Sequence, residues 1–173
     1  MAESASISLT GDDLAHLHRC IELAEESLAA GDEPFGSLLV DPNGRVIYED
    51  RNRVKDGDAT QHPEFAIARW AAENLSREVR ADSVVYTSGE HCPMCSAAHA
   101  WVGLGTIVYA ASGEQLRSWL SQWGVDSGPV APLSIQQVAP TVESVGPVAE
   151  LIPQVKGVHA TYHGIAEEEA EDQ

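Results

Sequence analysis

The stretches Gln-His-Pro-Glu-Phe at residues 61–65 and Gly-Glu-His-Cys-Pro-Met-Cys at residues 89–95 decide what this chain folds around. Together they hold one histidine and two spaced cysteines, a donor set that zinc takes in open catalytic sites, where water fills the fourth position. Two cysteines three residues apart at the start of a helix face the same way, so both thiolates reach one ion. His62, Cys92 and Cys95 are therefore candidate zinc ligands.

Glu64 stands two residues after the first ligand, which suits a proton shuttle beside the metal better than a fourth ligand. Pro63 between them favours a helix start, because the N–H that proline lacks would have no intrahelical partner there. Such a helix directs the positive end of its dipole at the metal site. A simpler role for Glu64 is to stabilise that dipole, and this role is compatible with proton transfer.

The combination of His-x-Glu with a later Cys-x-x-Cys resembles the zinc-dependent cytidine and deoxycytidylate deaminase superfamily, which includes cytosine, guanine and tRNA adenosine deaminases. Pro34-Phe35-Gly36 before a first strand and Asn52 after a second extend the likeness over residues 34–109, under half of the chain. The resemblance implies a three-layer α/β/α sandwich with a mixed sheet of about five strands and helices on both faces. It also implies that His62, Cys92 and Cys95 are the ligands of one zinc ion, that Glu64 is the general acid/base of a hydrolytic deamination, and that the enzyme is a homodimer.

Two positions beside the predicted metal site depart from the family pattern. Relatives usually have alanine or glycine, whose backbone N–H donates to the base, where this chain has Pro63, which cannot donate. The proline that usually precedes the first cysteine is His91 here. Either the substrate lacks an acceptor facing residue 63 or it lies differently, and His91 either donates to it or faces solvent.

Other side chains are candidates for contacting the substrate. Asn52 is the candidate base reader, because an amide donates and accepts along a heterocycle edge; a turn residue is the alternative. Phe35 is either a pocket wall or a core residue. C-terminal elements often close the pocket in the resembling family, and four late side chains are candidates for this: Trp123, His159, Tyr162 and His163.

Hydrophobic periodicity predicts the remaining elements. They are helices over residues 12–30, 63–75, 93–102 and 114–123, and strands over residues 37–41, 45–50, 83–87 and 106–110. The alternation of strand and helix in the second half predicts parallel last strands in a sheet covered on both faces. Weaker patterns indicate a fifth strand at residues 134–138, a short helix at 146–155 and a closing strand or lid at 158–163.

Length and composition fit one globular domain, predicted over residues 1–164 and followed by an acidic disordered tail, 165–173. Cys20, left over from the metal set, is predicted to be a small buried apolar residue. The chain lacks an apolar run near 18 residues and a basic-then-apolar start, which predicts a cytoplasmic protein outside the membrane. The net charge of −17 argues against a nucleic-acid partner, since phosphate binding uses basic surfaces.

These features predict a zinc-dependent aminohydrolase of a small free heterocycle, such as guanine, cytosine or an s-triazine, with guanine deaminase the nearest resemblance. A tRNA-specific adenosine deaminase is the alternative within the class, disfavoured by the acidity. A non-catalytic zinc-stabilised protein or a Cys-x-x-Cys redox module is the alternative of another class. Redox chemistry would not need the His62–Glu64 pair, and a structural zinc would want a fourth protein ligand.

Overall fold

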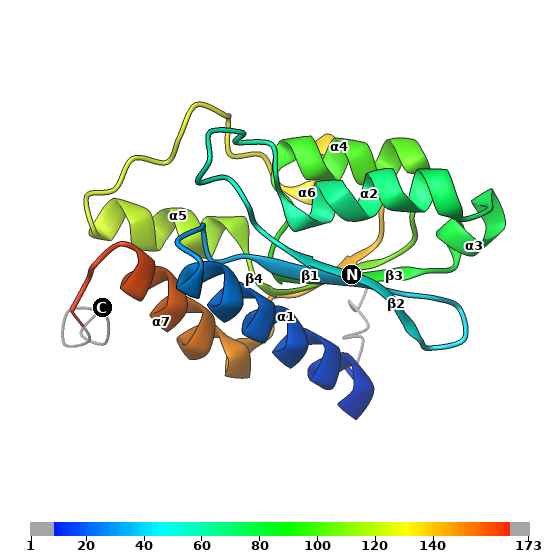
Figure 1. Cartoon of the computed structure of the whole chain (residues 1–173), viewed down its shortest axis with the longest axis horizontal. Helices are drawn as coiled ribbons and strands as arrows, with labels where there is room; N and C mark the ends of the chain where they lie inside the picture. Colours follow the sequence, from blue (N-terminus) through cyan, green and yellow to red (C-terminus); the bar gives the residue numbers. More distant parts are fainter. Residues whose placement is uncertain (1–8, 167–173) are drawn as a thin grey trace, which may run out of the picture.

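The computed structural model of this chain describes residues 9–166, which form a three-layer α/β/α sandwich (Figure 1). Its mixed sheet has five strands in the order β2-β1-β3-β4-β5. Strand β1 runs antiparallel to β2 and β3, whereas β3, β4 and β5 are parallel. The strands are β1 (Gly36–Val40), β2 (Val46–Arg51), β3 (Val84–Gly89), β4 (Ile107–Ala111) and β5 (Ser144–Val145). The predicted fold class and the parallel last strands are confirmed.

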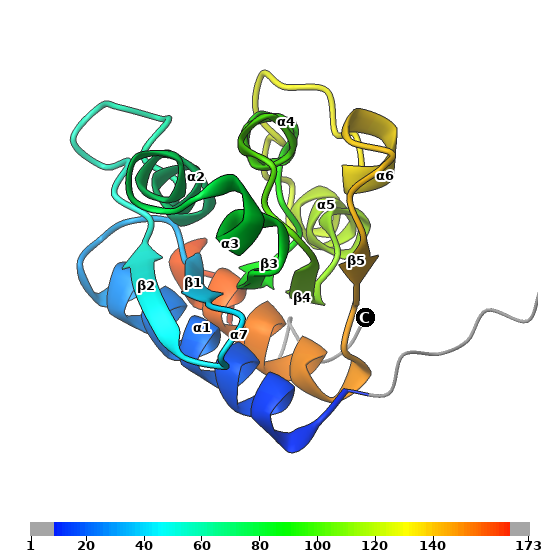
Figure 2. The ribbon, with the colours of Figure 1, turned by 90° about the vertical axis from the view of Figure 1, so that its right-hand side faces the viewer.

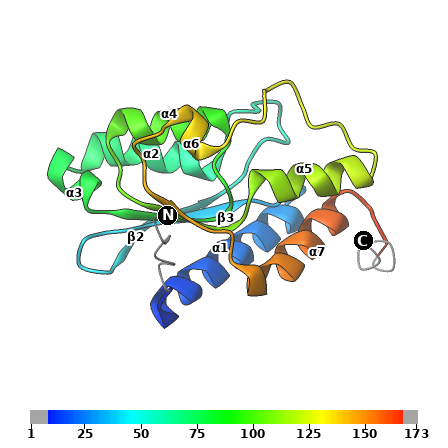
Figure 3. The same ribbon diagram turned by 180° about the vertical axis from the view of Figure 1, so that it is seen from behind.

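Helices cover both faces of the sheet (Figure 2). Helices α1 and α7 lie on one face, and α2 and α4 lie side by side on the other. Figure 3 shows the short α6 beside α4. The helices are α1 (Gly11–Ala29), α2 (Pro63–Asn74), α3 (Arg77–Ala81), α4 (Pro93–Val102), α5 (Gly113–Gln122), α6 (Ile135–Val138) and α7 (Ile152–Tyr162), with a 3-10 turn at Ala149–Leu151.

The core divides between the two faces of the sheet because successive strand residues point in opposite directions. Leu38 of β1 packs with the α1 and α7 side, and Leu39 packs with α2 on the other side. Cys20 lies in the first of these clusters and is fully buried, as predicted. Helix α1 crosses β1 so closely that a Cβ on Gly36 would lie 2.3 Å from the carbonyl oxygen of Cys20. Only glycine fits this crossing.

The predicted fifth strand at residues 134–138 was wrong. Helix α6 occupies this segment, with Ser134 as its N-cap and Gln137 completing a capping box. The side chains of Ser134 and Gln137 satisfy backbone N–H groups at the helix start, and this outweighs the weak strand pattern of so short a segment. The fifth strand lies later, at β5.

The predicted strand or lid at residues 158–163 was also wrong, because this segment belongs to helix α7. Val155, Val158 and His159 are buried at three- and four-residue steps, which is the period of a helix face packed on the core. The helix expected over residues 146–155 therefore begins later and extends further. Helix α3 was not predicted.

Residues 167–173 of the predicted acidic tail lie outside the described residues. Within residues 9–166, the structure has no helix that is both long and apolar enough to cross a membrane.

Candidate metal centre and active site

The three predicted zinc ligands meet where helices α2 and α4 begin. His62 is the N-cap of α2, and Cys92 is the N-cap of α4; neither side chain caps its own helix. Cys95 follows in the first turn of α4. The Nδ1 atom of His62 lies 3.6 Å from the Sγ atoms of both cysteines. All three donor atoms lie within 4.8 Å of one another.

This spacing fits a tetrahedral zinc ion. Bonds of about 2.3 Å to sulfur and about 2.1 Å to nitrogen at the tetrahedral angle place the two donor atoms about 3.6 Å apart. Both observed distances from His62 to the cysteines have this value. The group contains three protein ligands among the described residues, which is the number typical of a catalytic site with one open position.

The electrostatics of the ligands favour a thiolate at Cys92. Hydrogen bonds from the Cys95 thiol and then from His62 lower the pKa of Cys92 to about 4. The hydrogen bond to Cys92 raises the pKa of His62 to about 9. The pKa of Cys95 rises, because Cys92 takes its hydrogen bond and because burial disfavours its charge. Since zinc binds thiolates, Cys92 is ready to ligate, and Cys95 must lose its proton to do so.

Glu64 lies in the first turn of α2 with its side chain buried beside the ligands. Its Oε1 atom accepts hydrogen bonds from the hydroxyls of Ser37 and Thr87, both at 3.0 Å. Its Oε2 atom lies 3.7 Å from Sγ of Cys95. Burial raises the pKa of Glu64. One oxygen is therefore anchored to the sheet, and the other faces the metal centre.

The two anchoring hydroxyls come from neighbouring strands. Ser37 and Thr87 are direct register partners of β1 and β3, and the Ser37 hydroxyl also lies 2.8 Å from that of Thr87. Both side chains are fully buried, and the period of two places Ser37 on the same face as Leu39, toward α2.

We expect Thr87→Val to lower kcat by between about 10-fold and 100-fold, because a hydrogen bond to a charged group contributes roughly 1.5–3 kcal/mol. Valine keeps the shape of threonine but removes the hydroxyl that holds Glu64. Zinc content should not change. Thr87→Ser, which keeps the hydroxyl, is the matched control and should retain most of the turnover. Equal losses in both variants would mean that packing, rather than the hydrogen bond, matters at this position.

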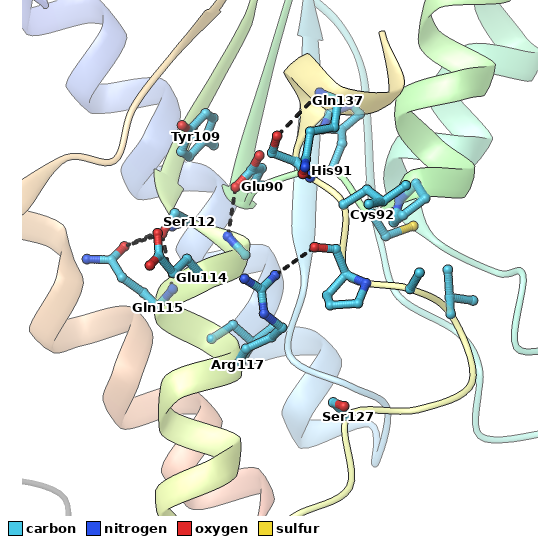
Figure 4. A pocket seen from close by; sticks show the side chains of 18 of the residues that line it. Glu90, His91, Cys92, Tyr109, Ser112, Glu114, Gln115, Arg117, Ser127 and Gln137 are labelled. Carbon is cyan, nitrogen blue, oxygen red and sulfur yellow. Dashed lines mark hydrogen bonds between the residues drawn. The ribbon is translucent and has the colours of Figure 1, made fainter.

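A cavity of about 770 Å³ opens beside the metal centre (Figure 4). His62, Glu64 and Cys92 line one part of it, and the first turns of α5, the segment before α6 and α6 itself line the rest. Cavities of this size hold small organic ligands. Two of the three metal ligands, His62 and Cys92, and the buried carboxylate therefore face a space that can hold a substrate.

The predicted substrate contacts are placed differently from one another. Phe35 and His91 line the cavity, whereas Asn52 and Pro63 are buried outside its lining. The Oδ1 atom of Asn52 accepts a hydrogen bond from the N–H of Val54 at 3.0 Å, and its Nδ2 donates to Glu33 at 3.4 Å. The four late candidates for closing the pocket also lie outside its lining: Trp123, His159, Tyr162 and His163.

His91 is 2% exposed. Neither ring nitrogen has a hydrogen-bond partner among the residues that the structure describes. The ring packs edge-on against His99, with the centroids 5.4 Å apart. Burial lowers the pKa of His91 well below its usual range, so the ring is neutral and carries one donor and one acceptor.

Sequence reasoning missed three polar side chains around the centre: Ser37, Thr87 and Glu90. The signal for the first two was present, because each is a hydroxyl residue inside a buried strand, Ser37 in β1 and Thr87 in β3. The Glu90 carboxylate accepts backbone hydrogen bonds from two distant elements. No local pattern indicates this role.

The sequence profile described as the cytidine and deoxycytidylate deaminase zinc-binding region matches residues 10–111. The chain therefore belongs to this family of zinc-binding deaminases, hydrolytic enzymes whose members it resembles in its two metal-site stretches.

Several relatives carry more specific names. A probable cytosine deaminase of Schizosaccharomyces pombe is 35% identical over 155 residues, which is 84% of this chain and 90% of the relative. The guanine deaminase of Bacillus subtilis is 38% identical over 97 residues, 55% of this chain and 62% of the relative. A tRNA-specific adenosine deaminase of Agrobacterium fabrum is 36% identical over 90 residues, which is 50% of this chain and 59% of the relative.

Solved structures share the whole fold. The guanine deaminase of Nitrosomonas europaea superimposes with a TM-score of 0.68 at 21% identity, covering 95% of this chain and 98% of that one. At this level of identity the comparison establishes the fold. The relatives thus include deaminases of cytosine and guanine.

Proposed function

We propose that this chain hydrolyses the exocyclic amine of a small free nucleobase or related amino-heterocycle, of the guanine, cytosine or s-triazine type, and releases ammonia. One observation carries the proposal. The buried carboxylate of Glu64 is held beside a three-ligand zinc site, and both line one cavity. This arrangement supplies a metal with an open position, a proton carrier and room for a planar ligand.

Bound zinc would supply a Lewis acid that lowers the pKa of water toward neutrality. In the proposed reaction, Oε2 of Glu64 takes a proton from the attacking water and passes it to a ring nitrogen. The water oxygen bonds to the amino-bearing carbon. Glu64 then delivers the second proton to the amine, the carbon–nitrogen bond breaks, and ammonia leaves. The Ser37 and Thr87 hydroxyls keep Oε1 fixed throughout, so only the other oxygen carries the proton.

Four side chains are proposed to select the heterocycle. Phe35 forms an aromatic wall of the cavity, and His91 lines it with both ring nitrogens buried and without a partner among the described residues. Asn52 is fully buried outside the cavity lining; its side chain retains one hydrogen and one lone pair beyond its contacts with Glu33 and Val54, and it would read the base edge only where the substrate reaches it. Pro63 offers no N–H, so the donor that residue 63 cannot supply would come from His91.

The S. pombe relative supports a free-base substrate, because its likeness extends over most of both chains. The tRNA adenosine deaminases are also relatives, so a tRNA substrate is the second candidate. Charge disfavours it, because the net charge is −17. Of the basic residues on and after β2, Arg51 pairs with Asp32, Arg53 pairs with Asp50, and Lys55 donates to the carbonyl of Ala30. A phosphate track needs free cations.

Ammonia release across a substrate panel tests the proposal. The zinc-loaded protein is given guanine, cytosine, isocytosine, adenine, amino-triazines, the matching nucleosides and a tRNA. We expect release from one or more free bases and much less from their nucleosides and from tRNA. Release from tRNA alone would favour the second candidate. Silence on the whole panel with zinc bound would overturn the proposed substrate class.

The geometry of the metal site disfavours the alternative hypothesis of a redox or purely structural protein. The described ligand group contains three protein donors, and a buried carboxylate stands beside them.

We also propose, on the family resemblance, a cytoplasmic homodimer with a single domain over residues 1–164. Trp101 on α4, which is 90% exposed, supports an interface on that helix, since tryptophan is usually well buried.

A further inference from the structure

Glu90 lies two residues before the ligand Cys92 and contacts two helices that are distant in the sequence. Its Oε2 atom accepts a hydrogen bond from the backbone N–H of Gly113 at 2.8 Å. Its Oε1 atom accepts one from the backbone N–H of Ile135 at 3.0 Å. The backbone N–H of Glu90 itself donates to Ala111 at the end of β4. Figure 4 shows the bond from the Glu90 carboxylate to the start of α5. With the bond to Ile135, a single carboxylate joins the metal-binding loop to the starts of α5 and α6.

The two helix starts are built alike. Ser112 caps α5 and Ser134 caps α6, each in a capping box that satisfies the N-cap and third-residue N–H groups. The capping boxes do not use the N–H of the first helical residue, Gly113 in one helix and Ile135 in the other. Glu90 accepts both. Each helix start therefore depends on Glu90 for one of its N–H groups, which a helix cannot satisfy by itself.

Both helix starts belong to the wall of the cavity. Gly113 lines it directly, as does Ser134 beside Ile135, while Cys92 lines it on the metal side. The geometry points to Glu90 as a positioning residue that fixes the substrate-facing wall of α5 and α6 relative to the zinc ligands. The expected effect of Glu90 on KM rests on the proposed function, whereas its expected effect on the starts of α5 and α6 does not.

Direct contact between Glu90 and substrate is the competing explanation, because the carboxylate is only partly buried and lines the cavity. Gly113→Pro separates the two. Proline is accepted at the first position of a helix, and Ser112 before it already has the extended conformation that proline requires. The ring carbon takes the place of the hydrogen that Glu90 binds and pushes the carboxylate away from the start of α5. A loss in this variant therefore needs the hydrogen-exchange measurement below to assign it to the helix starts. Gly113→Ala keeps that hydrogen, and its Cβ would lie 3.5 Å from the carboxylate, an ordinary contact.

Steady-state kinetics on the best substrate of the panel is the first test. We expect Glu90→Gln and Gly113→Pro each to raise KM by between about 10-fold and 100-fold, the range expected when groups move by up to about 1 Å. The change in kcat should be smaller, since the zinc ligands and Glu64 stay in place. Gly113→Ala keeps the hydrogen bond to Glu90, so it should raise KM much less than Gly113→Pro does. The double variant should be no worse than the worse single variant, because both remove the same link.

Two kinetic results would overturn the inference. The first is a fall in apparent kcat with KM unchanged, because this is what a general loss of folded protein produces. A large effect of Glu90→Gln with no effect of Gly113→Pro would assign Glu90 to substrate contact instead.

Hydrogen exchange supplies a readout that needs no substrate. In zinc-loaded Glu90→Gln, backbone amides at the starts of α5 and α6 should exchange faster than in the native chain, while those of α2 and α4 should not change. Unchanged exchange at α5 and α6 would overturn the inference even if turnover fell. Faster exchange there, in a chain that deaminates no member of the panel, would support the inference and leave only the proposed function rejected.

Discussion

Glu64→Gln is expected to bind zinc as fully as the native chain and to lose turnover by between about 100-fold and 10,000-fold, the contribution typical of a general acid–base residue. Glutamine has the same shape, and its Oε1 atom can still accept from the Ser37 and Thr87 hydroxyls. It cannot carry a proton between water and substrate. Because Glu64 is not among the grouped ligands, metal binding should survive.

The measurement is kcat on the best substrate together with zinc content per chain. Glu143→Gln is a suitable control, because that carboxylate accepts a hydrogen bond from Thr106 at an exposed position away from the metal. Loss of zinc along with activity would make Glu64 a ligand rather than a shuttle. Full activity would mean that another carboxylate of the cavity, Glu90 or Glu114, carries the proton.

The elements nearest the metal were predictable because their signals are local. Pro63 and Pro93 mark helix starts by a backbone property that does not depend on the rest of the fold. The hairpin turn between β1 and β2 also has a local signal, because Gly44 adopts a positive φ of 79°, which glycine allows. The segment at residues 134–138 was not predictable, because the four residues of α6 are too few to show a helical period and its capping box competes with a strand pattern.

The residues of the site also divide into those with a local sequence signal and those that depend on long-range contacts. The pairing of Cys92 with Cys95 follows from their spacing, because one turn at the start of α4 places both. The inclusion of His62 followed from the family resemblance. The register of β1 against β3 brings Ser37 beside Thr87, and register depends on long-range pairing that a single sequence does not reveal. The contacts of Glu90 depend on where two helices end up after the whole sheet has formed. Side chains that act through distant backbone groups therefore need the structure.

Cys95→Ala is expected to remove the zinc site and with it a large part of the thermal stability. Cys95 lies in the first turn of α4, is fully buried, and contacts Glu64. Its side chain therefore contributes to core packing as well as to metal binding. A metal held at between about 100 and 1,000 times its dissociation constant stabilises the folded state by roughly 2.7–4.1 kcal/mol. For a chain of this size each kcal/mol shifts the melting temperature by about 2–4 °C.

The sharp form of this test compares melting temperatures with and without a strong chelator. The native chain should melt lower by about 5–16 °C once zinc is removed, as these magnitudes imply. Cys95→Ala should melt at the lower temperature in both conditions. Cys20→Ala is the matched control, since Cys20 is equally buried but lies in the cluster on the opposite face of the sheet.

That control should lose some stability from its cavity and keep the full response to the chelator. The comparison also separates zinc from redox chemistry at Cys92 and Cys95, because a disulfide-forming pair responds to oxidants and reductants but not to a chelator. A native melting temperature that moves with reductant and ignores the chelator would remove the metal from this site. The proposed deamination would fall with it, since Glu64 would act on water whose pKa no metal lowers.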